Sequence, residues 1–179
     1  MYYDVVERFV SINGEGKKSG ELAVFFRFAN CNLSCPYCDT KWANVRDVHT
    51  EKMTEEDILA YIKNEKIYNV VLTGGEPLFR TGMRQLILYL LQNVDIHIEI
   101  ETNGSIDLME YINISPKVSL TMDYKLPSSK MEKSMCLKNL EILRKNDSVK
   151  FVVGDNGDLM RTKEIIDSYN LSGRVNVLI

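Results

Sequence analysis

The sequence predicts an α/β protein, a partial (β/α)6-type barrel of mostly parallel strands. Two observations predict it. First, six apolar segments of strand length alternate with segments of helical pattern between residues 22 and 179, and strands joined through helices pair in parallel by right-handed crossovers. Second, segment 94–101 is apolar on one side and ionisable on the other, which suits a barrel with helices outside and a functional interior. An open doubly wound sheet is the alternative, because periodicity does not separate the two.

The first half of the chain supplies two predicted strands and two predicted helices. Residues 22–29 are apolar almost throughout, as in a strand that is covered on both faces. Residues 54–64 predict a helix, because a threonine can cap it, three acidic residues fill its first turn and its apolar residues share one face. Residues 68–72 are a short apolar run that leads into Gly74-Gly75, and residues 83–91 have a helical pattern.

The second half continues the alternation. Segment 94–101 reads as a strand, and Asn103-Gly104 ends it with a turn. The elements expected after it are a strand at 117–123, a helix at 137–143, a strand at 149–153, a helix at 158–169 and a strand at 175–179. Ligands bind beyond the carboxyl ends of parallel strands. The residues at such ends, which predict the position of the site, are Cys31, Gly74-Gly75, Thr102-Asn103 and Asp123.

Composition narrows the class of protein. The 179 residues suffice for one domain of ordinary size, and we expect a single domain over residues 1–179. The 22 basic residues are outnumbered by 25 acidic ones, so the chain lacks the basic surplus typical of nucleic-acid binders. No apolar run has the length of a membrane span, and the first residues do not form a secretion signal. We therefore expect a cytoplasmic protein without nucleic-acid or membrane partners.

Three of the four cysteines lie within eight residues. Cys31, Cys35 and Cys38 form a CxxxCxxC motif, and three thiolates can hold three irons of a cubane cluster and leave the fourth iron open to another ligand. A structural zinc site is the alternative, but it needs a fourth ligand, and neither His49 nor Cys136 has the usual spacing. We expect Cys136 to be a plain buried thiol.

Two motifs in this order resemble the radical S-adenosylmethionine superfamily. They are the CxxxCxxC motif, with Tyr37 before its last cysteine, and Gly74-Gly75-Glu76-Pro77 after the next predicted strand. The resemblance implies a radical SAM core that binds a [4Fe–4S] cluster and S-adenosylmethionine. It places the methionine group of that cofactor on the open iron and the GGEP segment beside its amino group. In such enzymes the cofactor performs the difficult chemistry while the protein positions it.

Further segments resemble the 7-carboxy-7-deazaguanine synthase family. They are Ser11-Ile12-Asn13-Gly14-Glu15-Gly16, Phe26-Arg27-Phe28, Cys38-Asp39-Thr40-Lys41, Thr73 with the GGEP motif, Glu101-Thr102-Asn103-Gly104 and Ser115-Pro116-Lys117. The resemblance implies a lyase that uses Mg²⁺ and contracts the ring of 6-carboxy-5,6,7,8-tetrahydropterin. The product is 7-carboxy-7-deazaguanine, ammonia is released, and the pathway leads to queuosine and related deazapurines of modified tRNA. It also implies a homodimer and flavodoxin or ferredoxin as reductant.

The same resemblance assigns site residues. The substrate would contact the backbone of Ile12, Asn13 and Gly14, the guanidinium of Arg27 and the side chain of Thr73. The family often has Gln at the position of Asn13, and an arginine suits a planar carboxylate. S-adenosylmethionine would contact Tyr37, Cys38, Asp39, Gly75, Ser115, Pro116 and Lys117. Thr40 would ligate Mg²⁺, although threonines after loops more often cap helices.

The strand at 94–101 adds candidates of its own. If its ionisable side faces the barrel interior, Glu101 lies nearest the catalytic end, and Glu99 lies one layer below. We expect Glu101 to be the catalytic contact to substrate or cofactor, and His97 to have a structural hydrogen bond. The alternative is a solvated face on an edge strand.

Two alternative functions stay open, and the sequence differs from the family pattern in one respect. A radical activase of a glycyl-radical enzyme would share CxxxCxxC but would not explain Arg27 and Thr40. A non-catalytic iron–sulfur or zinc module would bind metal without cleaving S-adenosylmethionine. Members of the family usually continue past the sixth strand, so a chain that stops at Ile179 is either a short member or lacks a C-terminal segment.

Overall fold

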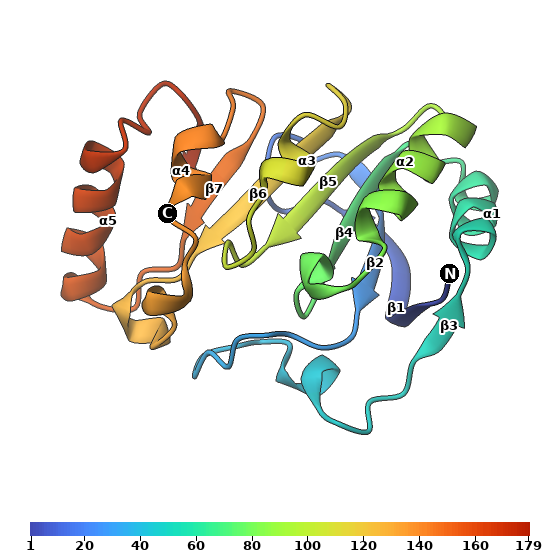
Figure 1. Ribbon diagram of the computed structural model, residues 1–179, viewed down its shortest axis with the longest axis horizontal. Coiled ribbons are helices and arrows are strands. Elements are labelled where there is room, and N and C mark those ends of the chain that lie inside the picture. Colours follow the sequence, from blue (N-terminus) through green and yellow to red (C-terminus); the bar gives the residue numbers. More distant parts are fainter.

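A single eight-stranded sheet organises the protein (Figure 1), in the order β3-β1-β2-β4-β5-β6-β7-β8. The structure is a computed structural model that describes residues 1–179. Six neighbouring strands are parallel and follow one another in chain order. They are β2 (Leu22–Phe28), β4 (Asn69–Gly74), β5 (His97–Thr102), β6 (Val118–Tyr124), β7 (Ser148–Phe151) and β8 (Asn176–Leu178). All six strands expected from the sequence are present.

Two further strands extend the sheet beyond β2 and were not expected. β1 (Tyr3–Ile12) pairs antiparallel with β2, and β3 (Glu51–Met53) pairs antiparallel with β1. The sheet is therefore mostly parallel, and the two antiparallel strands β1 and β3 form one of its edges.

Five α-helices connect the strands. They are α1 (Glu55–Glu65), α2 (Met83–Asn93), α3 (Met109–Ile112), α4 (Lys138–Ile142) and α5 (Asn156–Ser168). Thr54 caps α1 as expected: its hydroxyl accepts from the Asp57 amide while the Asp57 carboxylate accepts from the Thr54 amide, a capping box. Only the one-turn helix α3 lacks a counterpart among the predicted elements.

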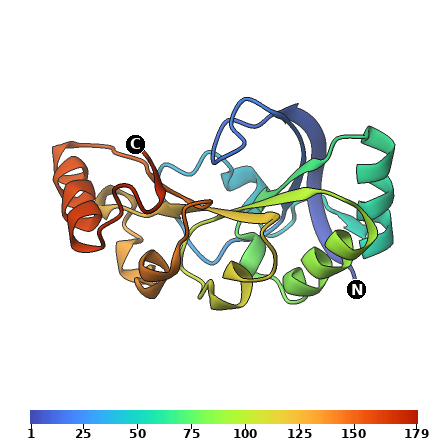
Figure 2. The same cartoon turned by 90° about the horizontal axis from the view of Figure 1, so that it is seen from above.

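The helices lie along the outer side of the curved sheet, and the loop of residues 13–21 lies on the inner side (Figure 2). Residues from both the strands and all five helices form one cluster of 34 buried apolar side chains. On β5, Ile98 and Ile100 belong to that cluster, while the intervening Glu99 points to the inner side. One-sided helices and strands in chain order make this a partial barrel and not a doubly wound sheet. None of the helices combines the length and apolar character needed to cross a bilayer.

Candidate active site

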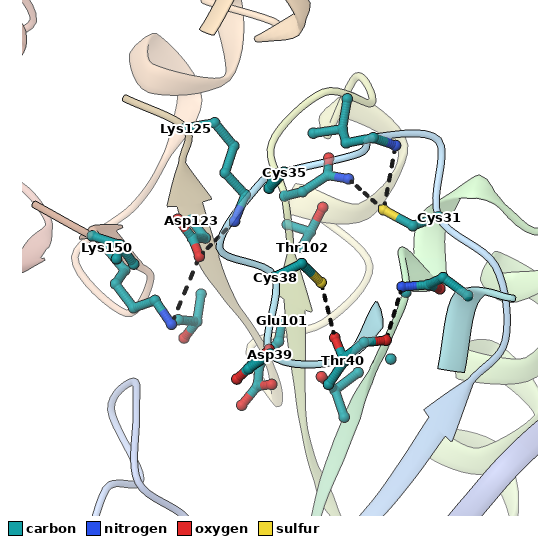
Figure 3. Close-up of a pocket in the computed structure, with 18 of the residues that line it drawn as sticks. Cys31, Cys35, Cys38, Asp39, Thr40, Glu101, Thr102, Asp123, Lys125 and Lys150 are labelled. Atoms are coloured by element: carbon teal, nitrogen blue, oxygen red, sulfur yellow. Dashed lines mark hydrogen bonds and ion pairs between the residues drawn. The ribbon is translucent and has the colours of Figure 1, made fainter. Parts of the chain in front are cut away.

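The carboxyl ends of the parallel strands surround a cavity of about 410 Å³ (Figure 3). Side chains from β2, β4, β5, β6 and β7 line it, together with the cysteine loop between β2 and β3. The predicted site residues that line this cavity are Arg27, Cys31, Cys35, Tyr37, Cys38, Asp39, Thr40, Thr73, Gly75 and Glu101. Arg27 and Glu101, predicted site residues that are 74 positions apart in the sequence, therefore share one cavity.

The cysteine loop brings three thiols to the cavity wall. Cys31 Sγ accepts hydrogen bonds from the Leu33 amide at 3.4 Å and from Asn103 Nδ2 at 3.5 Å. The Cys38 amide donates to the Cys35 carbonyl at 3.2 Å, which closes a turn between these two residues. All four cysteines are free, and Cys136 does not line the cavity.

This donor set fits an iron–sulfur cluster with three protein ligands. Cys136 does not line the cavity, so the three cysteines there are one short of the four ligands typical of a structural zinc site. Hydrogen bonds from N–H groups to a ligand sulfur are among the features that tune such clusters. Cys31, Cys35 and Cys38 are the residues that could hold the cluster.

Gly74 and Gly75 are required by close backbone contacts. Gly74 has φ +134°, and a Cβ there would lie 2.2 Å from the carbonyl oxygen of Phe28. A Cβ on Gly75 would lie 1.9 Å from the carbonyl oxygen of Asn30. The Gly75 amide donates to the Phe28 carbonyl at 2.9 Å. The glycine turn after β4 therefore packs directly on the start of the cysteine loop.

Glu76, the third residue of the GGEP motif, points away from the cavity. Its buried carboxylate accepts from the amides of Leu78 and Asn103 and from the Thr102 hydroxyl. Burial raises its pKa to about 7 against the opposing effect of these hydrogen bonds. The motif thus offers the backbone of Gly74 and Gly75 to a cofactor, while Glu76 joins two strand ends.

The ionisable side of β5 faces the interior, so the alternative of a solvated face is wrong. Glu101 lines the cavity and has a hydrogen bond with Thr73, and burial raises its pKa to about 7. Glu99 lies one layer below and is 1% exposed. His97 Nε2 lies 2.9 Å from Ser119 Oγ, which agrees with a structural role.

Arg27 is the cation on the β2 side of the cavity. Its Nε donates to Glu7 Oε1 at 2.8 Å, and its guanidinium lies 6.0 Å from the centre of the Trp42 ring. The pairing explains how a charged residue is accommodated in an apolar strand. The bond to Glu7 uses only Nε, so the two terminal nitrogens are the part of the fork that could bind an anion.

The structure does not bring residues 12–14, the predicted substrate contacts, to the cavity wall. Neither Ile12, Asn13 nor Gly14 lines the cavity, whose lining on this loop begins at Glu15. The Asn13 amide donates to the Glu21 carbonyl at 2.8 Å, and its own carbonyl accepts from the Gly20 amide at 2.8 Å. The backbone groups of Asn13 are therefore paired within the loop.

The structure also does not bring Ser115, Pro116 and Lys117, the predicted contacts to S-adenosylmethionine, to the cavity. These residues precede β6 (Val118–Tyr124), so they lie at the amino end of a strand whose carboxyl end reaches the cavity. A seven-residue strand spans about 20 Å, which separates the two ends. Lys117 instead pairs with the exposed Asp95.

Sequence reasoning placed Asp123 at this end of the sheet but missed two lysines in the cavity, Lys125 and Lys150. Lys125 Nζ lies 2.9 Å from Asp123 Oδ2, and Lys150 Nζ lies 2.6 Å from Glu15 Oε1 (Figure 3 shows the two lysines around Asp123). Asp123 Oδ1 is buried without a hydrogen-bond partner, so it is an acceptor open to a bound molecule. Their positions at the carboxyl ends of β6 and β7 were the signal that could have identified them.

Fold and cavity together define a class of cluster-binding enzyme, and the chain matches the family model of the Radical SAM superfamily over residues 26–167. Membership of this superfamily implies a [4Fe–4S] cluster and S-adenosylmethionine as cofactors. The crystal structure of QueE from Escherichia coli shares the fold, with a TM-score of 0.78 and 24% sequence identity. That alignment covers 99% of this chain and 83% of the other.

Relatives with known names narrow the class. The 7-carboxy-7-deazaguanine synthase of Clostridium acetobutylicum is 52% identical over 179 residues, which are 100% of this chain and 81% of the relative. The enzyme of the same name from Thermoplasma acidophilum is 34% identical over 167 residues, covering 92% of this chain and 77% of the relative. The chain belongs to the 7-carboxy-7-deazaguanine synthase family.

Proposed function

We propose that the protein is a radical carbon–nitrogen lyase that converts 6-carboxy-5,6,7,8-tetrahydropterin to 7-carboxy-7-deazaguanine with release of ammonia. The observation that carries the proposal is one cavity in which three cysteines, the glycine turn and Arg27 meet, in a chain 52% identical to a synthase of that name. This activity would supply queuosine and other deazapurines.

One side of the cavity would bind the cofactors and the other side would bind the substrate. Cys31, Cys35 and Cys38 would hold the [4Fe–4S] cluster, which when bound supplies the electron that cleaves S-adenosylmethionine. Tyr37, Asp39 and the Gly75 backbone line the same region and would orient that cofactor. Their placement on one short loop and one turn fixes the cofactor relative to the cluster.

Arg27, Thr73 and Glu101 would bind the pterin. The terminal nitrogens of Arg27 suit its carboxylate in a bidentate arrangement. The Glu101 carboxyl has a pKa of about 7, so both of its protonation states are populated near neutral pH. Glu101 can therefore hold or accept a proton at Oε1 or Oε2 without a large energetic penalty, and this is the role we assign to it.

Mg²⁺ would bind at Thr40. Thr40 occupies the N-cap position of the short helix Lys41–Asn44, but its hydroxyl makes no capping bond and lies 3.5 Å from Cys38 Sγ. The hydroxyl is therefore available to a ligand, and Mg²⁺ usually keeps several waters and takes anionic oxygens from its substrate. We further propose a single domain, a homodimer in the cytoplasm, and flavodoxin or ferredoxin as electron donor.

The test is turnover by anaerobically reconstituted protein. With S-adenosylmethionine, Mg²⁺, a chemical reductant and the tetrahydropterin, we expect 7-carboxy-7-deazaguanine and ammonia in equal amounts, measured by mass spectrometry and an ammonia assay. Cleavage of S-adenosylmethionine without conversion of the pterin would reject the substrate. A fully loaded cluster that cleaves no S-adenosylmethionine would reject the enzyme class.

A further inference from the structure

The loop of residues 13–21 crosses the inner face of the sheet from β1 toward β7 (Figure 2). Asn13 Nδ2 donates to Glu99 Oε2 at 2.8 Å, which fixes the loop to β5 at its start. Lys17 Nζ contacts Asn146 Oδ1, in the segment before β7. The loop thus spans most of the sheet below the cavity.

Gly16 brings the backbone of this loop directly onto the sheet. It has φ +67°, and a Cβ there would lie 1.7 Å from Glu99 Oε1 and 2.6 Å from Thr121 Oγ1. No side chain fits between the loop and the strands at this point. Because Glu99 lies one layer below Glu101, the loop forms the floor beneath the part of the cavity that holds Glu101.

Lys150 joins this floor to the cavity wall. Its ammonium lies 2.6 Å from Glu15 Oε1 of the loop and 3.7 Å from Asp123 Oδ2 of β6. Lys150 itself belongs to β7, so one side chain connects the loop, β6 and β7. Without it, the partly buried Glu15 carboxylate would lie near the carboxylates of Glu101 and Asp123 with no ion-pair partner of its own, because Lys125 pairs with Asp123.

We propose that Lys150 is a positioning residue, a clasp that holds the loop of residues 13–21 closed as the floor of the substrate cavity. The closure is argued from contacts within the protein alone, those of Lys150 with Glu15 and Asp123. Its consequence for substrate affinity rests on the function proposed above. Lys150 would affect the substrate through the loop of residues 13–21. When the loop leaves the sheet, the substrate site loses one of its sides.

Limited trypsin digestion of the protein without its cofactors tests the closure. The loop contains Lys17 and Lys18, and the Lys18 carbonyl accepts from the Glu21 amide at 3.1 Å, so the segment must open before it can enter the protease in an extended form. We expect Lys150→Met to be cut after these residues about tenfold faster than the wild type, which corresponds to an opening equilibrium shifted by about 1.4 kcal/mol. Lys150→Arg should keep the wild-type rate, since arginine can make the same two contacts.

Lys117→Met is the matched control, because it removes a lysine from a pair with Asp95 at the opposite end of the sheet. It should not change cleavage in the loop. If Lys150→Met does not fold, Glu15→Gln breaks the same contact from the loop side. Wild-type cleavage rates in Lys150→Met or in Glu15→Gln would overturn the clasp.

Steady-state kinetics of the reconstituted enzyme test the consequence. We expect KM for the tetrahydropterin to rise about tenfold in Lys150→Met, with the iron content and the cluster absorbance of the wild type. Faster loop cleavage with an unchanged KM would overturn the positioning role. If the wild type does not turn over the pterin, the proposed function fails, while trypsin digestion still decides whether the clasp exists.

Discussion

The Thr102 hydroxyl donates a hydrogen bond to Glu76 Oε1 at 2.9 Å, and both side chains are buried. Glu76 follows β4 and Thr102 ends β5, so this bond connects the carboxyl ends of two neighbouring strands. Asn103 extends the connection, since its amide donates to Glu76 Oε2 at 2.6 Å and its Nδ2 lies 3.5 Å from Cys31 Sγ. The glycine turn, the end of β5 and the first cysteine are therefore coupled.

The coupling predicts a stability cost for Thr102→Val. The substitution preserves shape but removes one donor from a buried carboxylate, which should lower the free energy of unfolding by about 1–3 kcal/mol. Urea denaturation at pH 7 measures it. Thr162→Val is the matched control, because that buried hydroxyl donates only to the Asp158 carbonyl within α5. A cost for Thr102→Val no larger than the control would show that the bond contributes little.

The three-cysteine assignment predicts different outcomes for two cysteines. Cys35→Ala should abolish both assembly of the [4Fe–4S] cluster and turnover, because two remaining thiolates cannot replace the third ligand. Cys136→Ala should retain both, since Cys136 lies outside the cavity. Iron content and the visible spectrum after anaerobic reconstitution measure the difference. A normal cluster in Cys35→Ala would remove this residue from the ligand set.

The six parallel strands could be predicted because each is a short segment of apolar or alternating pattern. β1 could not, because Asp4, Glu7 and Arg8 interrupt its pattern. The structure places a partner beside each charge: Asp4 Oδ2 lies 2.9 Å from Arg80 and Glu7 Oε1 lies 2.8 Å from Arg27. Such partners come from distant segments, so local periodicity carries no trace of them.

The site residues likewise separate into those that local sequence patterns predict and those that they do not. The cysteine loop, the glycine turn and Glu101 could be placed because they follow directly from motifs and from strand alternation. Lys150 could not, because its function depends on Glu15, 135 residues away. The prediction for Ser115–Lys117 used the motif alone, whereas strand direction puts Asp123 and not Ser115 at the cavity.

The position of Arg27 in the cavity predicts that its substitution by lysine lowers substrate affinity without affecting the cluster. Arg27→Lys keeps the charge and the pairing with Glu7, but an ammonium cannot bind Glu7 and also present a planar fork to a carboxylate. We expect KM for the tetrahydropterin to rise about tenfold or more, with cluster content unchanged. Arg8→Lys is the control, because Arg8 pairs with Glu51 and lies 5.0 Å from the Tyr61 ring, outside the cavity. Equal effects of both substitutions would argue against a substrate contact.

Glu101 predicts a pH-dependent stability difference. Burial raises its pKa to about 7 in the folded protein, above the ordinary value of 4.5. Between these values the folded state binds more protons than the unfolded state, so this carboxyl lowers stability as pH rises. Glu101→Gln has no proton to lose. The unfolding free energy of the wild type minus that of the variant should therefore fall between pH 4.5 and 7.

Urea denaturation of the cofactor-free protein at several pH values measures this difference. The comparison with Glu101→Gln cancels other titrating groups, among them His97, whose pKa burial lowers. Glu21→Gln is a useful contrast, because the pKa of that exposed carboxyl is lowered by its bonds to Asn69 and Lys18. A flat difference for Glu101→Gln from pH 4.5 to 7 would mean that Glu101 ionises as it does in the unfolded chain.

Thr40 predicts a change in Mg²⁺ dependence that leaves the cluster intact. Its hydroxyl makes no capping bond, so Thr40→Ala removes a potential metal ligand without breaking the turn that the Thr40 carbonyl supports through the Ala43 amide at 3.0 Å. We expect the Mg²⁺ concentration for half-maximal turnover to rise about tenfold in Thr40→Ala. Thr40→Ser keeps the hydroxyl and should retain the wild-type response. Turnover titrated with Mg²⁺, alongside the cluster absorbance of each variant, measures this. Identical titrations of Thr40→Ala and the wild type would exclude Thr40 from the magnesium site, since the substitution removes the only side-chain oxygen at that position.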